Sequence, residues 1–360
     1  MHNINRKCIE MENFDEYLIQ GEPSKAEKAK VWKTAIGLQQ VDGLKPSEYL
    51  IATAKQNIEG DISIEEVQKR IETYYQQHPT QDPENRTEEA DKVSAQIAEI
   101  LNEKAFTFSP AEFIFIHRRL FKDIYKFAGK VRRYNITKKE WVLNGETVLY
   151  GTAESLMATL EYDFEQEKKF KYKGISKQDM IEHIAQFISN LWQIHIFGEG
   201  NTRTIAIFLI KYLRTFGFEL NNNLFAEHSW YFRNALVRAN YKNHAKNIDA
   251  TLEFLIRFFE NLLLGKNHIL KNRMMHVQYS DPMNDLTKTP IDPVNDLVND
   301  PVKASILQQL KQNSKANYQA LAKSTGYSIS TIKRHIQELK KLGKINRIGS
   351  DKTGHWKIID

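Results

Sequence analysis

The feature that most constrains this chain is a run of Asp-Pro steps between residues 279 and 301. Asp-Pro occurs at 281–282, 292–293 and 300–301, in a segment otherwise rich in Asn and Asp. Proline removes a backbone donor and moves the preceding residue out of the helical region, so three such steps oppose a packed helix or sheet. We therefore expect a linker at 279–301 and a separate domain at 302–360. A weaker break, HPTQDPEN at 78–85, predicts a further division into 1–80 and 86–278.

Charge is unevenly distributed between these parts. Residues 303–360 hold 12 Lys or Arg against three acids, whereas the rest of the chain holds 39 against 42. The basic surplus therefore belongs to the carboxy-terminal domain, and it predicts contact with a polyanion unless the lysines serve only as a solvated surface.

The remaining composition excludes several classes of protein. No apolar run approaches the roughly 18 to 20 residues that cross a bilayer, so we expect no membrane association. The acidic residues near the amino terminus disagree with a signal peptide, and Cys8 is the single cysteine. A disulfide framework is excluded, and the expected compartment is the cytoplasm.

Residues 86–278 are predicted to be mainly helical. Apolar residues recur at spacings of three and four in several stretches, such as MIEHIAQFISNLWQIHIF and TRTIAIFLIKYLRTFGF. Lys130 to Leu149 differs, because it carries β-branched and aromatic residues around Asn144-Gly145, a strong hairpin signal. We expect a mainly α fold with one β-hairpin lying as a flap on the helical body.

The string HIFGEGNTR, from His195 to Arg203, carries the chemistry. It lies between two predicted helices, and its glycines at 198 and 200 allow a tight curl in front of free helix amides, which favours an anion such as phosphate. Glu199 would repel phosphate directly but is suited to hold Mg²⁺ against it. The unperturbed pKa of histidine lies near neutral pH, so we expect His195 to act as a general base.

This string resembles the core of the Fic (fido) family, His-Pro-Phe-x-Asp/Glu-Gly-Asn-Gly-Arg-x-x-Arg. The matching positions are His195, Phe197, Glu199, Gly200, Asn201 and Arg203. Further similarity lies in IHRRLFKDIYKFAGKVR (116–132), NITKK (135–139), SNLWQIH before the loop and YFRNALVRANY (231–241) after it. The resemblance implies a Fic helical core with a β-hairpin flap.

The resemblance also implies an activity, protein adenylylation. His195 would deprotonate a Ser, Thr or Tyr hydroxyl of a target protein, which attacks the α-phosphate of ATP. Glu199 would hold Mg²⁺, and Arg203 would neutralise the departing charge. The implied nucleotide contacts are Phe197, Gly198, Gly200, Asn201, Arg203 and, less directly, Asn240. Ile136, Thr137 and Lys138 on the flap would hold the target segment by strand addition.

Three positions depart from the family pattern. Ile196 replaces the proline and Thr202 the second glycine, and neither side chain has an assigned role. The second arginine falls at Ala206, so the usual clamp for the γ-phosphate is missing. A donor other than ATP therefore stays open.

Residues 34–67 resemble the VbhA-type antitoxin domain that inhibits Fic enzymes through a glutamate. The best alignment uses Leu38 to Gly43 and places Asp42 at the inhibitory position, facing Ala206, where it would lose its charged partner. A second alignment uses Lys55 to Gly60, with Glu59 as the inhibitor. The alternative is a helical cap at 18–77 that only packs on the core.

Residues 302–360 resemble a winged helix-turn-helix. Ile332, Ile336, Leu339 and Leu342 form one apolar stripe of a helix predicted at 328–342. The opposite face suits a major groove, and the wing adds a lysine. The candidate DNA contacts are Ser330, Thr331, Lys333, Arg334 and Lys352. A protein-docking role is the alternative.

The sequence thus predicts a protein adenylyltransferase that uses ATP and Mg²⁺, acts on a target protein and binds DNA, in the manner of a toxin-antitoxin regulator. The rival hypothesis is a DNA-binding transcriptional regulator whose Fic core senses a nucleotide without turnover.

Overall fold

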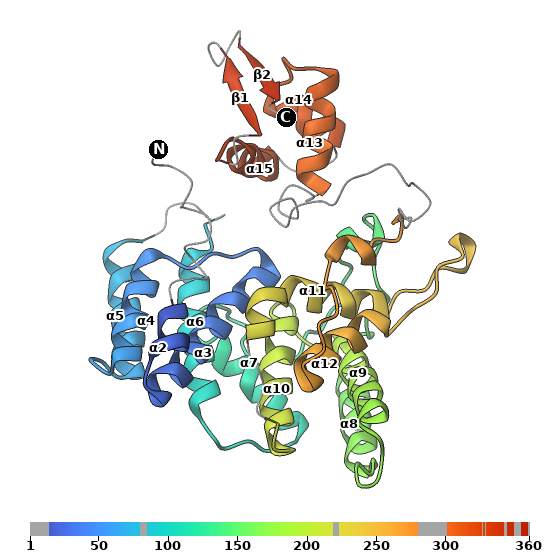
Figure 1. Ribbon diagram of the computed structural model, residues 1–360. Coiled ribbons are helices and arrows are strands. Elements are labelled where there is room, and N and C mark those ends of the chain that lie inside the picture. The colour runs from blue at the N-terminus through green and yellow to red at the C-terminus, as the bar shows by residue number, and fades with distance from the viewer. Residues whose placement is uncertain are drawn as a thin grey trace. The chain divides into compact units, whose positions relative to one another are not determined.

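The computed structural model describes residues 14–79, 85–218, 223–279, 301–325, 327, 329–341, 344–348 and 354–358. The chain divides into two compact units, Met1–Val277 and Gln278–Asp360. Both are mainly helical (Figure 1). The predicted break at 78–85 and linker at 279–301 lie mostly outside the described residues, and Pro301 is already the first residue of a helix.

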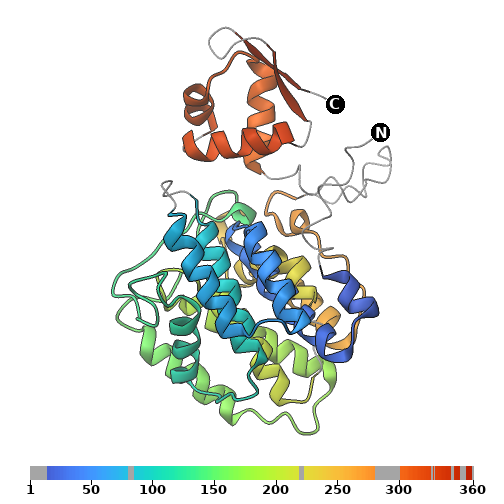
Figure 2. The same ribbon diagram turned by 90° about the vertical axis from the view of Figure 1, so that its left-hand side faces the viewer.

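The first unit is built from α-helices joined by short turns and 3-10 segments (Figures 1 and 2). Its amino-terminal elements are α2 (Asp15–Gln20), α3 (Pro23–Gly37), η1 (Leu38–Asp42), α4 (Glu48–Glu59) and α5 (Ile64–Gln77). The elements that follow are α6 (Thr87–Asn102), α7 (Pro110–Leu120), η2 (Trp141–Leu143), α8 (Leu156–Lys169), α9 (Lys177–Ile194), α10 (Asn201–Thr215), α11 (Asn223–Ala239), η3 (His244–Lys246), α12 (Glu253–Leu264) and η4 (Asn272–Met275).

Serine residues begin several of these helices. The hydroxyls of Ser47, Ser63, Ser109 and Ser176 each accept a bond from the amide three residues further on, at the starts of α4, α5, α7 and α9. Each bond satisfies one of the free amides of the first turn, a contribution of about 1 kcal/mol per cap. The helix boundaries are therefore set locally by the sequence.

The amino-terminal helices share one hydrophobic core with the central ones. Trp32, Ile58 and Ile71 belong to the same buried cluster as Trp192 and Phe208. A Cβ atom on Gly37 would lie 2.3 Å from the Cα of Ala226, so glycine is required where α3 crosses α11. The cluster extends on both sides of the weak break predicted at 78–85.

A buried carboxylate adds a polar tie between these helices. Asp91 on α6 is fully buried and accepts hydrogen bonds from the Ser47 amide at 2.8 Å, the Ser47 hydroxyl at 2.5 Å and the Tyr75 hydroxyl at 2.7 Å. These bonds fix the start of α4 and the end of α5 to α6.

The segment predicted as a hairpin reverses at Asn144-Gly145, as expected. Both residues have a positive φ, 55° and 85°. Two backbone bonds close the reversal, from the Gly145 amide to the Glu140 carbonyl and from the Glu140 amide to the Glu146 carbonyl. The arms are extended but are not regular strands, since η2 interrupts one arm and buries Val142 and Leu143. This reversal, residues 130–149, is called the flap below.

The second unit contains α13 (Pro301–Gln312), α14 (Tyr318–Thr325), α15 (Ile329–Lys341), β1 (Ile345–Ile348) and β2 (His355–Ile358). The strands pair antiparallel, with Arg347 opposite Trp356. Ile306, Leu321, Ile332, Ile336 and Leu339 are buried together with Trp356. Three helices followed by a two-stranded sheet are the arrangement of a winged helix-turn-helix.

Candidate active site

The loop from His195 to Gly200 connects α9 to α10, as the sequence predicts. His195 ends α9 in the left-handed region, with φ 48° and ψ 54°, and Gly200 begins α10 with φ 77°. A Cβ on Gly200 would lie 2.3 Å from the Phe121 ring, so this position requires glycine for space as well as for its dihedral angle.

Asn201 holds the curl of the loop together. Its Oδ1 accepts a bond from the Phe197 amide at 3.0 Å, and its Nδ2 donates to the Phe197 carbonyl at 2.8 Å. The side chain is 3% exposed. Asn201 therefore shapes the backbone that would receive a phosphate, and its predicted direct contact with the nucleotide stays a prediction.

The imidazole of His195 is oriented by its own helix. Nδ1 lies 3.3 Å from the Trp192 carbonyl oxygen, a contact that requires Nδ1 to carry the proton. Nε2 then has a lone pair, and no group in the described part of the chain bonds to it. Burial lowers the pKa of His195 well below its ordinary value, and the charges of Lys138, Arg233 and Arg132 lower it further. The ring is therefore neutral at neutral pH, which is the form that a base requires.

The same imidazole is covered. His195 is 4% exposed, and the Tyr150 ring centroid lies 4.4 Å from that of the histidine. Tyr150 follows the flap and donates its hydroxyl to Glu140 at 3.1 Å. A target hydroxyl reaches Nε2 only if this cover moves.

Arg132 is a positioning residue that the sequence did not single out. Its Nε donates to the His195 carbonyl at 2.7 Å, and its Nη2 donates to the Gly151 carbonyl. The guanidinium thus joins the first arm of the flap and Gly151, two residues after its second arm, to the end of α9. Nothing in one sequence distinguishes Arg132 from the neighbouring Arg133, which is exposed.

Glu199 points outward and is paired with the flap. Its side chain is 47% exposed, and Oε2 lies 3.2 Å from Lys138 Nζ. Its backbone carbonyl lies 3.0 Å from Nε2 of the buried His117. Among the described residues no cluster of three metal-ligating side chains exists. One carboxylate fits Mg²⁺ only where nucleotide phosphates complete its oxygen ligands, which is the usual way in which Mg²⁺ binds with nucleotides.

Arg203 is fully buried in a polar cluster at the start of α10. Its Nη1 donates to Gln39 at 3.0 Å, and its Nη2 lies 2.7 Å from Glu89 and 2.8 Å from Asp42. The guanidinium also lies 4.8 Å from the centroid of the Phe121 ring. The predicted phosphate-binding arginine is therefore occupied by carboxylates in this structure.

The pairing of Asp42 differs from the sequence expectation. We expected Asp42 to face Ala206 and to lose its charged partner, whereas the carboxylate pairs with Arg203. Ala206 lies one turn further along α10 and is fully buried in the apolar core. Glu59, the alternative inhibitor, pairs with Lys25 at 2.8 Å.

Comparison with known proteins identifies this region. The model of the Fic/DOC family matches residues 107–213, and a winged helix-turn-helix DNA-binding model matches residues 300–346. The chain carries a Fic/DOC domain. It also carries a carboxy-terminal winged helix-turn-helix.

Individual relatives are distant. The protein adenylyltransferase VbhT of Bartonella schoenbuchensis is 27% identical over 106 residues, which cover 29% of this chain and 21% of the relative. A probable protein adenylyltransferase of Sinorhizobium fredii is 30% identical over 109 residues, 30% of this chain and 54% of the relative. The chain thus spans about a fifth to about half of the length of these relatives. A solved Fic family protein from Desulfovibrio desulfuricans aligns with 97% of this chain and 93% of its own at 11% identity, with a TM-score of 0.45.

Asn240, for which the sequence suggested a contact with adenine, lies beyond the residues 107–213 that the Fic/DOC model matches. Its Nδ2 donates to the Ser189 hydroxyl at 2.9 Å and to the Leu236 carbonyl at 2.9 Å. The amide therefore ties α11 to α9, and the adenine contact stays a prediction.

The flap of the Fic/DOC domain presents the three predicted docking residues along one arm. Thr137 is exposed, whereas Ile136 and Lys138 are half-buried. The Lys138 amide donates to the Thr147 hydroxyl at 3.3 Å, across to the other arm. Gly198 lies beside the flap, since a Cβ on it would lie 2.6 Å from the Tyr134 hydroxyl. Contact with a target strand is not tested by this geometry.

In the winged helix-turn-helix, α15 presents Lys333, Arg334 and Gln337 to solvent. Lys333 Nζ lies 5.9 Å from the Tyr318 ring centroid. Thr331 is half-buried, and the Ser330 side chain, Leu342 and Lys352 lie outside the described residues. The predicted basic face is thus present for the part of α15 that the structure describes.

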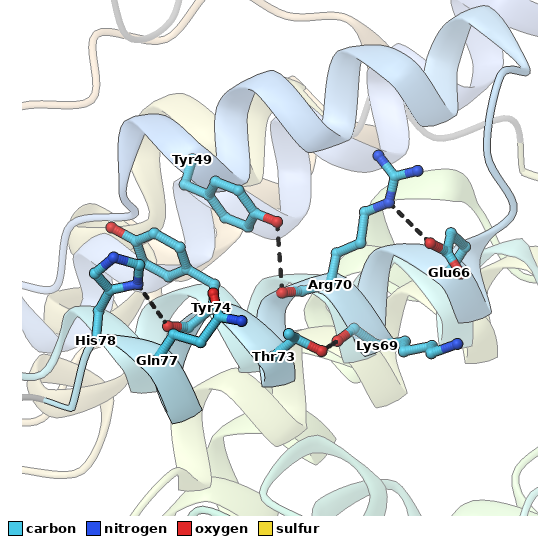
Figure 3. Close-up of a pocket in the computed structure, with 8 residues that line it drawn as sticks. All are labelled: Tyr49, Glu66, Lys69, Arg70, Thr73, Tyr74, Gln77 and His78. Atoms are coloured by element: carbon cyan, nitrogen blue, oxygen red, sulfur yellow. Dashed lines mark hydrogen bonds and ion pairs between the residues drawn. The ribbon is translucent and has the colours of Figure 1, made fainter.

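A groove on α4 and α5 lies apart from the residues of the predicted site. It is lined by Tyr49, Tyr74, His78 and five other residues (Figure 3), none of which belongs to that site. No described helix is both long and apolar enough to span a bilayer.

Proposed function

We propose that the protein transfers AMP from ATP to a Ser, Thr or Tyr hydroxyl of a target protein. The observation that carries the proposal is the free Nε2 lone pair of His195 beside the curl that leads into α10. A sensor that only binds a nucleotide has no need of a neutral imidazole with a free lone pair beside this loop.

The chain's own residues would divide the reaction as follows. Nε2 of His195 takes the proton of the target hydroxyl while the hydroxyl oxygen attacks the α-phosphorus. The bond between the α-phosphorus and the oxygen that bridges to the β-phosphate breaks, and pyrophosphate leaves with that oxygen. The backbone of Gly198 and Gly200 lies next to the first turn of α10, where free amides favour phosphate. Mg²⁺ held by Glu199 would neutralise phosphate charge, and Arg203 would stabilise the leaving group.

We further propose that the amino-terminal helices inhibit this reaction through Asp42. The carboxylate forms an ion pair with the Arg203 guanidinium at 2.8 Å, and Gln39 on the same 3-10 helix accepts a hydrogen bond from another of its nitrogens. Charge-assisted pairs are about twice as strong as neutral hydrogen bonds, so a nucleotide must displace a substantial contact.

The decisive experiment is incubation of the full chain with α-labelled ATP, Mg²⁺ and cell lysate. Label should appear on the chain itself or on a lysate protein, more strongly with Asp42→Asn, and it should be lost with His195→Asn. Absence of label from all four ribonucleotides in the Asp42→Asn protein contradicts the enzymatic function.

The second candidate function is a DNA-binding regulator with a nucleotide-sensing Fic core. The exposed Lys333 and Arg334 on α15 and the covered His195 favour it. It predicts DNA binding that responds to nucleotide while no label is transferred. We propose that the chain binds DNA in either case. We also propose that it regulates its own expression in a toxin-antitoxin manner, and that it acts in the cytoplasm.

A further inference from the structure

Arg233 on α11 is a partly buried cation to which the sequence motif assigns no role. Its side chain is 16% exposed, and its Nη1 and Nη2 lie 2.7 Å and 3.0 Å from the two carboxylate oxygens of Glu140 on the flap. Glu140 is 1% exposed and also accepts the Tyr150 hydroxyl at 3.1 Å. Arg233 is therefore held in a fixed orientation next to the cover of His195.

Asp42 belongs to the 3-10 helix that packs on the helices of both arginines. Residues 38–42 of η1 pack against both α10, which carries Arg203, and α11, which carries Arg233. Burial raises the pKa of Asp42, but Arg203, Arg233, Lys138 and Arg86 together lower it below its ordinary value. Arg233 and Lys138 also lower the pKa of His195. Arg233 and Lys138 therefore act electrostatically on both Asp42 and the proposed base.

The cations around Asp42 also have other carboxylate partners, and Glu89 is shared by Arg86 and Arg203. Lys138 pairs with Glu199 and Arg86 with Glu89, as Arg233 does with Glu140. Asp42 is the remaining carboxylate, comes from the amino-terminal helices and is 23% exposed at its side chain. If Asp42 moved out, the remaining cations would form a positively charged site, which a polyanion would neutralise better than a single carboxylate does.

We propose that Arg233 is a second anion-binding arginine of this site, and that Arg233 and Arg203 bind the terminal phosphates of the nucleotide in the space now held by Asp42. This proposal rests on the proposed function. Arg233 would take the part of the arginine missing at Ala206, from a different helix. A guanidinium has five N–H donors, so Arg233 can keep its two contacts to Glu140 and still donate to a phosphate.

The test is equilibrium binding of ATP and AMP to the full chain carrying Asp42→Asn, followed with labelled nucleotide. Adding Arg233→Gln should weaken ATP binding about ten- to a hundredfold, the range for a lost charged hydrogen bond, while AMP affinity changes less than about twofold. The matched control is Arg257→Gln, which removes a partly exposed arginine paired with Glu253 on α12. This control should leave both affinities unchanged.

A second variant distinguishes loss of phosphate binding from a folding defect. Arg233→Gln leaves the buried Glu140 carboxylate without its cation, so Arg233→Gln with Glu140→Gln is measured beside it, with circular dichroism to verify the fold. Selective loss of ATP affinity in this folded double variant is the expected result. Equal loss for ATP and AMP, or unchanged ATP binding, overturns the role of Arg233 while leaving the proposed function intact. Failure of Asp42→Asn protein with intact Arg233 to bind any adenine nucleotide overturns both.

Discussion

Asp42 and Arg203 form an ion pair of 2.8 Å between the amino-terminal helices and the first turn of the α10 helix. Arg203 is fully buried, so this pair lies in a medium where charges interact more strongly than in water. The same guanidinium is the one that the Fic motif assigns to phosphate. The contact therefore sets an internal carboxylate in competition with a nucleotide.

Removal of the Asp42 charge is expected to increase nucleotide affinity and self-labelling about tenfold, since one charge-assisted contact is worth roughly 1.5 kcal/mol or more. Asp42→Asn keeps the shape of the side chain, and filter binding of labelled ATP measures the effect. The control is Glu59→Gln, which changes the alternative inhibitory position, paired with Lys25 in this structure. If Glu59→Gln activates and Asp42→Asn does not, the alternative alignment of the antitoxin-like segment is the right one.

Loss of the proposed base is expected to reduce label transfer at least about a hundredfold, because positioned proton transfer contributes roughly that much. Asparagine is the suitable replacement, since it tolerates the left-handed backbone found at His195. His195→Asn should therefore retain its melting temperature and its ATP affinity. His78→Asn, at an exposed histidine, is the control. Transfer at the parental rate by His195→Asn would remove the imidazole from the mechanism.

Stability should fall as the pH is lowered from about 6.5 to 5. His117 is fully buried, its Nδ1 accepts a bond from the Gly129 amide at 2.8 Å, and burial lowers its pKa to about 4. In the unfolded chain its pKa is near 6.5, so the unfolded state binds the proton first and is favoured below that pH.

The expected loss from His117 over this interval is about 2 kcal/mol, and the lowered pKa of His195 adds to it with the same sign. Urea midpoints at pH 7.5, 6.5, 5.8 and 5 measure it. His117→Asn should show a flatter dependence on pH than the parent. An equally steep dependence would assign the effect to other groups.

How much of this site was predictable depends on the range of the contacts involved. The curl at His195 to Gly200 follows from local glycines between two periodic helices, and the sequence predicted it. The reversal at Asn144-Gly145 is equally local and was also predicted. The regular strands expected on both sides of it did not form, because η2 buries Val142 and Leu143 in the helical body instead.

Contacts between distant segments were not predictable. Arg203 meets Gln39 across 164 residues, and Arg233 meets Glu140 across 93. A single sequence contains no information on which of many arginines and acids become neighbours. For this reason the prediction of the partner of Asp42 was wrong. The sequence analysis also did not identify Arg132, Tyr150 or Arg233 as residues of the site.

Glu199 is expected to set the Mg²⁺ requirement of the reaction. Glu199→Gln should raise the Mg²⁺ concentration for half-maximal labelling several-fold, because an amide oxygen is a weaker ligand for Mg²⁺ than a carboxylate. The control is Glu182→Gln, at an exposed glutamate on α9. A magnesium titration of self-labelling measures the shift. An unchanged titration would mean that Glu199 acts mainly as the partner of Lys138.

The basic face of α15 is expected to contact DNA phosphates. For the full chain on a random duplex, the logarithm of affinity should fall linearly with the logarithm of salt concentration, with a slope of about −0.9 for each phosphate neutralised. Lys333→Gln with Arg334→Gln should make the slope less steep by about two, as gel shifts at several salt concentrations would measure. Both side chains are exposed on α15.

The control is Lys311→Gln with Lys315→Gln, which removes the same charge from the same unit at exposed positions outside α15. If both pairs reduce the slope equally, the effect is one of net charge, and the prediction that α15 lies in the major groove is contradicted. If neither changes it and affinity hardly depends on salt, phosphate contact is contradicted, and a protein-docking role for the winged helix-turn-helix explains its exposed basic residues better.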